Sequence, residues 1–162
     1  MAGRHWLIVV TAIVLIFIAG FLCVWLRPAT TLVFQLPTGF TGPFILVEDP
    51  VGVPLRASQG SITVRVPSSR IAVVRSFDPL LKDWSRIIAI TPEREFSYLD
   101  DQSAREQPQQ FALRGFRFLR ESDGGNEIRT FEFCLGRSEH DVPGQFQRLR
   151  DNWIRRSTTN SS

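Results

Sequence analysis

The sequence has few cysteines and few histidines, and this shortage excludes disulfide scaffolds and most metal-binding modules. Cys23 lies within a long apolar run and Cys134 lies far along the polar part of the chain, so no disulfide between them is expected. His5 and His140 are the two histidines, and structural zinc needs four ligands at paired spacing. We therefore expect no metal and no cofactor, and a domain held together by its apolar core.

A strong excess of charge of one sign is also missing. The net charge is +3, but from Pro28 onward 17 Lys and Arg residues stand against 16 Asp and Glu residues. A protein that binds the phosphates of a nucleic acid usually has a clear excess of Lys and Arg over Asp and Glu. The near-neutral balance therefore predicts no nucleic-acid partner.

Charge is wholly missing from the twenty residues between Leu7 and Leu26. As a helix rising 1.5 Å per residue, this stretch would be about 30 Å long, which matches the hydrocarbon core of a bilayer. Trp6 and Trp25 stand at its two ends with Arg4 and Arg27 just outside them, as is typical of residues that anchor a helix at the membrane interface. The stretch is predicted to be a transmembrane helix whose partner is the lipid bilayer.

Two patterns predict whether the helix is retained and which way it points. A cleaved signal peptide needs a small residue near its exit, where Arg27 stands, and a lipoprotein signal needs one before its cysteine, where Leu22 precedes Cys23. The amino-terminal side carries Arg4 and the terminal amine, whereas the other side carries Arg27 and then no basic residue until Arg56. The positive-inside rule therefore favours a single-pass anchor in the cytoplasmic membrane, with the carboxyl-terminal domain outside the cytoplasm.

Beyond the anchor, short apolar segments separated by proline- and glycine-rich turns predict a β-rich domain. Ile62, Val64 and Val66 alternate with polar residues, which is typical of a half-buried strand. The clearest pair is a hairpin in which two Phe-rich segments flank turn-forming residues at 123–126. Strands are expected at 31–36, 44–48, 60–66, 71–75, 87–91, 111–120 and 128–135, with turns at 49–54 and a long polar loop over 93–110.

The same composition places the boundaries of the domain. Residues 1–6 form a flank, 27–30 a juxtamembrane linker, 31–156 the β-rich domain, and 157–162 a polar tail that is expected to be disordered. Within 143–156, Phe146, Leu149 and Trp153 stand three and four residues apart, which predicts an amphipathic helix. The predicted fold class is mainly β, as an antiparallel β-sandwich or partly open barrel with a C-terminal amphipathic helix.

One segment resembles a known protein family. Residues 36–50 read LPTGFTGPFILVEDP, and Gly52 and Pro54-Leu55 follow. This segment is similar to the opening of an uncharacterised bacterial family of membrane-anchored or secreted small β-rich domains of unknown function. Residues 133–136 (FCLG), followed by 138–140 (SEH), are similar to a late strand of the same family. The resemblance implies a bacterial, envelope-associated β module and brings no catalytic residues with it.

The predicted carboxyl-terminal helix is rich in arginine, and this admits two interpretations. In the first, the helix packs its apolar stripe on the sheet while the arginines reach solvent. In the second, the basic side contacts anionic lipid headgroups or an acidic partner. The residues proposed for that contact are Arg148, Arg150, Trp153, Arg155 and Arg156.

Evidence for an enzyme is weak in the sequence. His140 beside Asp141, together with Ser68 or Ser69, could be imagined as hydrolase residues, but no Gly-x-Ser-x-Gly elbow is present. Gly124-Gly125 lacks the strand and helix context of a phosphate-binding loop. Several acidic residues of the polar loop could be considered for a catalytic carboxylate pair, but solvated surface charges are the favoured interpretation. They are Glu93, Glu95, Asp100, Asp101 and Glu106.

The sequence therefore predicts a single-pass, membrane-anchored and non-catalytic β-rich module that acts through protein or cell-envelope contacts. One alternative is a small membrane-tethered hydrolase that uses His140. Another is a cytoplasm-facing module that binds an acidic partner through its carboxyl-terminal arginines.

Overall fold

The computed structural model describes residues 30–81, 84–123, 126–137 and 142–159. The predicted span from Leu7 to Leu26 lies outside these residues, as do its expected interface anchors Arg4, Trp6, Trp25 and Arg27. In the described ranges, no helix is long and apolar enough to cross a membrane.

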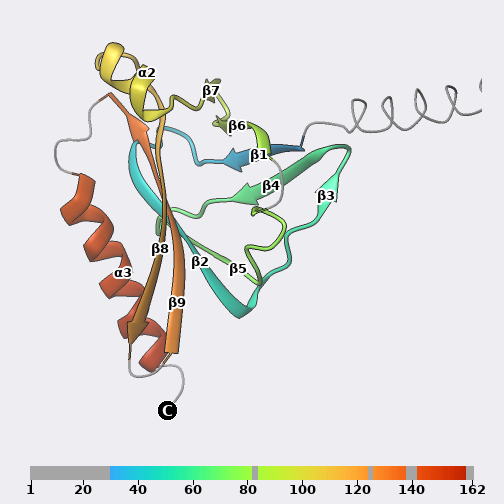
Figure 1. Ribbon diagram of the computed structural model, residues 1–162, viewed down its shortest axis with the longest axis vertical. Helices are drawn as coiled ribbons and strands as arrows, with labels where there is room; N and C mark the ends of the chain where they lie inside the picture. The colour runs from blue at the N-terminus through green and yellow to red at the C-terminus, as the bar shows by residue number, and fades with distance from the viewer. Residues whose placement is uncertain (1–29, 82–83, 124–125, 138–141, 160–162) are drawn as a thin grey trace, which may run out of the picture.

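The described chain is mainly β, as expected, and its strands form two sheets (Figure 1). Sheet A has the strand order β3-β4-β1-β6-β7, and sheet B has the order β5-β2-β9-β8. The elements are β1 Thr30–Gln35, β2 Gly42–Val53, β3 Ala57–Ser58, β4 Ser61–Arg65, β5 Ile71–Val74, β6 Trp84–Ile90, β7 Glu95–Ser97, α2 Asp101–Glu106, β8 Ala112–Asp123, β9 Asn126–Gly136 and α3 Val142–Thr159.

Both sheets are mixed, so the prediction of a purely antiparallel arrangement was wrong. In sheet A, β1 runs parallel to both β4 and β6, and in sheet B, β2 runs parallel to β5. The physical reason is that the chain leaves sheet A after β1 to form β2 in sheet B and returns for β3 and β4. A strand that returns by such a crossover can run in the same direction as the strand it left, unlike the second strand of a hairpin.

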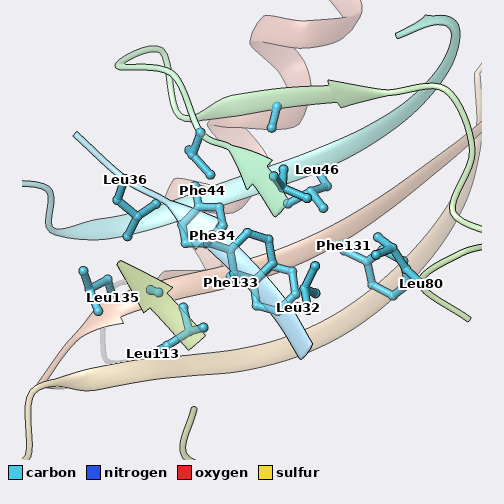
Figure 2. Close-up of a cluster of buried hydrophobic side chains, with 14 of the residues drawn as sticks. Leu32, Phe34, Leu36, Phe44, Leu46, Leu80, Leu113, Phe131, Phe133 and Leu135 are labelled. Atoms are coloured by element: carbon cyan, nitrogen blue, oxygen red, sulfur yellow. The ribbon is translucent and has the colours of Figure 1, made fainter. Parts of the chain in front are cut away.

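The main core fills the space between the two sheets. Phe34 of β1 packs across it against Phe44 of β2 and Phe133 of β9, with ring centroids 5.1 and 4.6 Å apart (Figure 2). The alternation predicted for β4 is confirmed, because Ile62 and Val64 are both buried in this core. Apolar side chains from both inner faces thus form one continuous core.

A second, smaller core lies between sheet B and α3, which lies beside β8 and β9 in Figure 1. Phe146 of α3 is buried there with Ile45 and Val47 of β2 and with Cys134, while Leu149 and Trp153 pack against this group from α3. Strand β2 is therefore buried on both faces, which explains its unbroken apolar run over 44–47.

The predicted helix is confirmed, but it is longer than 143–156. It begins at Val142 and ends at Thr159, so the tail predicted to be disordered from residue 157 is helical through 159. The hydroxyl of Ser157 donates to the carbonyl of Ile154 at 2.8 Å within this last part of the helix.

Several boundaries differ from the prediction because tertiary pairing extends the strands. Thr30 belongs to β1, since it pairs with Trp84, and not to the linker. Strand β2 continues past Asp49-Pro50 to Val53, with a register shift that accommodates the proline and an Asp49 carboxylate that accepts from the amide of Val51 at 2.9 Å. The stretch 93–110, predicted to be a loop, contains β7 and α2.

The predicted hairpin is confirmed. Strands β8 and β9 pair in antiparallel register from Ala112 and Gly136 to Asp123 and Asn126. The pairing slips between Arg114 and Arg117, where the intervening Gly115 has a φ of +64°. This glycine makes the bulge possible, because a positive φ is unfavourable for other residues.

Candidate functional site

The three parallel strands of sheet A end side by side. Gln35 at the end of β1 is in register with Arg65 of β4 and with Ile90 of β6. The pairing of β1 with β6 and of β4 with β1 continues for one more residue. The amide of Leu36 donates to the carbonyl of Ile90, and the amide of Val66 donates to the carbonyl of Gln35. The next residue of each chain segment is a proline, which has no amide hydrogen to continue the sheet; these are Pro37, Pro67 and Pro92.

A groove of about 570 Å³ lies along this line of strand ends. Gln35, Arg65, Ser68 and Thr91 are the polar residues of an otherwise apolar lining. Ends of parallel strands are common places for binding sites, because the loops that leave them can carry side chains without disturbing the sheet. The remaining lining residues are Leu36, Pro37, Val66, Pro67, Ile90 and Pro92.

A second hollow of about 410 Å³ adjoins the first and shares Thr91 with it. Arg94 lies over the rings of Phe96 and Phe111, with its guanidinium carbon 4.4 and 5.3 Å from their centroids. We call the two hollows together the carboxyl-end groove. The remaining lining residues of the second hollow are Thr38, Gly39, Phe40, Thr41 and Glu93.

The conspicuous sequence LPTGFTGPF builds one wall of this groove. Arg70 donates to the carbonyls of Thr41 and Pro43 at 2.6 and 3.2 Å, and its guanidinium lies over the ring of Phe40 at 4.8 Å. Gly42 has a φ of +92°, and a Cβ there would lie 2.8 Å from Nη1 of Arg70. The motif therefore fixes a tight connection between the two sheets.

The carboxyl-end groove holds groups that are suited to bind a ligand. Within the described ranges, neither Arg65 nor Arg94 forms an ion pair, so both guanidinium groups can donate to a ligand that presents oxygen acceptors. The lining holds hydroxyl groups and the carboxylate of Glu93 but neither histidine nor cysteine. Among the described residues, no three His, Cys, Asp or Glu side chains are grouped to hold a metal ion.

The structure separates the predicted contact residues of α3 into two groups. Arg150 is buried against sheet B, where it pairs with Glu132, and Trp153 is half-buried in the smaller core. Arg148, Arg155 and Arg156 are exposed. The apolar stripe of α3 is thus already used in packing. Of the three exposed arginines, Arg155 also donates to the side chain of Asn152 at 2.7 Å.

The residues considered for catalysis are not gathered into one site by the described chain. Ser68 lies in the carboxyl-end groove, while His140 and Asp141 lie outside the described residues. Glu95 pairs with Arg86 at 2.8 Å on the surface of sheet A. Asp100 caps α2, where hydrogen bonds from the backbone and side chain of Ser103 hold the pKa of its carboxyl below the ordinary value.

Sequence reasoning missed one buried arginine. Arg114 of β8 is only 3% exposed, and its guanidinium donates to the carbonyls of Ala104 and Gln107 at the end of α2 and of Gln110 beyond it. It holds the segment 104–110 onto the sheet by satisfying carbonyls that the short helix leaves open. No local pattern signals this role, because the helix itself was not predicted.

No family model and no curated protein matches this sequence, so the family resemblance of residues 36–50 stays a prediction. Among solved structures, the chain is similar to a crystal structure named "Putative Lipoprotein from Bacillus anthracis". The TM-score is 0.48 and the identity 13%, over 76% of this chain and 94% of that chain. A likeness this distant brings no function to this chain.

Proposed function

We propose that the chain is a single-pass membrane protein that holds a non-catalytic β-rich module at the outer face of the cytoplasmic membrane. The observation that supports this most is the sequence Leu7–Leu26, which is long and apolar enough to span and is followed within four residues by β1. So short a link keeps the module close to the bilayer.

The module acts by contact with a protein or a component of the cell envelope. Two surfaces are suited to this role, namely the carboxyl-end groove with Arg65 and Arg94 and the exposed arginines of α3. The groove is the better candidate, since its walls are fixed by the proline-terminated strands and by the Arg70 contacts, and a rigid site loses less entropy on binding.

A topology measurement tests the placement. A reporter that is active only outside the cytoplasm is fused after Ser162 in intact bacterial cells, and we expect an outside signal. The matched control is the same fusion without residues 1–29, which should report inside. An inside signal from the full chain would overturn the proposed orientation and favour the cytoplasm-facing module that binds an acidic partner.

A cross-linking measurement tests the groove. A photo-reactive amino acid replaces Ser68 in the full chain in cells, and we expect a specific adduct that is lost in the Arg65→Glu variant. The Arg117→Glu variant removes an exposed arginine from β8 and serves as the control. An adduct that forms equally in both variants would place the contact elsewhere.

The hydrolase alternative has its own test. If His140 is catalytic, His140→Ala should abolish an in vivo phenotype that depends on the protein. We expect the phenotype of the His140→Ala strain to match the wild type.

A further inference from the structure

The membrane-facing side of the module follows from where β1 begins. Four residue steps separate Leu26, the end of the predicted span, from Thr30, the first residue of β1. A fully extended chain of that length reaches at most about 14 Å. The headgroup layer itself is about 5 to 8 Å deep, so the part of the module around Thr30 must lie at or just above it.

The residues around Thr30 are the starts of the parallel strands. Thr30 pairs with Trp84 at the start of β6, and the amide of Thr31 donates to the carbonyl of Gly60 at 2.9 Å in the β3–β4 turn. Figure 1 shows β1 and β4 pointing the same way, away from this turn. We call this side of sheet A the amino edge.

The amino edge carries apolar groups of the kind that enter a membrane interface. Leu81 stands three residues before Trp84, the first residue of β6, and is 51% exposed. It ends a helical turn in which its amide donates to the carbonyl of Phe77 at 3.0 Å. Trp84 is partly buried, with its ring 6.2 Å from that of Phe131 in the main core. Trp and Leu side chains are favoured at the level of the headgroups and the first acyl carbons.

We propose that the amino edge lies on the bilayer, with Leu81 and the outer side of Trp84 in the headgroup layer. The parallel strands then stand away from the membrane, and the carboxyl-end groove opens on the far side of the module. A six-residue strand is about 20 Å long, so the groove lies up to about that far beyond the headgroups when the strands stand upright. This orientation rests on the membrane anchor of the proposed function.

Depth measurements on the full chain in phosphatidylcholine vesicles test the orientation. Cys23 is replaced by alanine, and single cysteines are introduced as Leu81→Cys or, in the groove, Ser68→Cys. Each is spin-labelled, and its collision rates are measured with oxygen, which concentrates in lipid, and with a water-soluble nickel chelate. The Cys23→Ala parent controls for labelling of Cys134, which is buried.

For each label, the collision rate with oxygen is divided by the collision rate with the nickel chelate. This ratio is expected to be at least several-fold higher for the Leu81 label than for the Ser68 label. Equal ratios at the two positions would overturn the proposal. So would a Leu81 label that is shielded from both reagents, because this would place a second copy or another protein on the amino edge.

A carbonate extraction distinguishes a wrong membrane anchor from a wrong orientation of the module. If alkaline carbonate extracts the unlabelled protein from cell membranes, the proposed function itself is wrong. If the protein resists extraction but the two labels give equal ratios, the anchor holds and the orientation is wrong.

Discussion

The guanidinium of Arg150 on α3 donates a hydrogen bond to the buried carboxylate of Glu132 on β9. The side chains are only 10% and 4% exposed, and Glu121 adds a second carboxylate 3.4 Å from Nε of Arg150. Gln147, one turn earlier on α3, accepts from the same guanidinium. These contacts tie α3 to sheet B in one position and rotation, because a charge-assisted hydrogen bond between buried groups is directional and costly to break.

Arg150→Ala should lower the free energy of unfolding by about 3 to 5 kcal/mol, because it leaves the Glu132 carboxylate buried without its partner. Arg148→Ala on the exposed side of the same helix should change it by less than about 0.5 kcal/mol. Pulse proteolysis of the full chain in detergent and urea measures both. Replacing the pair together, as Glu132→Leu with Arg150→Met, should recover most of the loss; a double variant as unstable as the single one would contradict this.

Phe133→Ala should cost about 3 to 5 kcal/mol of stability, because Phe133 is fully buried and packs against Phe34 and Phe44. The same urea titration measures it. Val51→Ala, at a residue that is 87% exposed, is the control and should be close to neutral. A loss below about 1 kcal/mol for Phe133→Ala would mean that β9 does not face the main core as described.

Two glycine substitutions should change stability in opposite directions. In Gly52→Ala the new Cβ would lie 2.5 Å from the backbone carbon of Val74, so β2 and β5 must move apart at a cost of about 1 to 3 kcal/mol. In Gly144→Ala the new methyl on α3 meets open space, and the gain in helix propensity should be about 0.5 to 1 kcal/mol. Thermal unfolding of both variants checks the signs, and a stabilising Gly52→Ala would refute the close approach.

The start of α2 should be sensitive to acid. The carboxylate of Asp100 accepts from the amide of Ser103 at 2.7 Å, and hydrogen bonds from Ser103 hold its pKa below the ordinary value of about 3.8. The stabilisation is therefore complete above pH 3.8 and is lost as the pH falls through the lower, folded-state pKa.

The Ser103 amide proton in NMR spectra reports this loss directly, through its chemical shift. In Asp100→Asn the cap is kept, because asparagine is also a good N-cap residue, but it no longer titrates. A Ser103 shift that follows pH equally in both proteins would contradict the assignment of the cap.

Local patterns predicted most of the strands and the last helix but neither the direction nor the order of the strands. The alternation of Ile62, Val64 and Val66 gives a strand and its buried face, because it depends only on the two-residue repeat. Whether β1 lies beside β2 or between β4 and β6 depends on crossovers that connect distant segments. The burial of β2 on both of its faces could not be predicted either, because it depends on the packing of α3 against sheet B.

The carboxyl-end groove could not be predicted for the same reason. Pro37, Pro67 and Pro92 each look like an ordinary strand terminator in the sequence. They become the boundary of one groove only through the register that aligns Gln35 with Arg65 and Ile90. The residues chosen from composition were instead those of a conspicuous arginine cluster, of which Arg150 proved to be part of the packing of α3.

The parallel pairing of β1 has a consequence for the order in which the protein is made. Both neighbours of β1 come late, since β4 begins at Ser61 and β6 ends at Ile90. At about 5 to 20 residues per second, the ribosome completes β6 roughly 3 to 11 s after β1. Both edges of β1 stay open until β4 has been made, and one edge stays open until β6 follows, so a newly made chain is most exposed to mispairing at this strand.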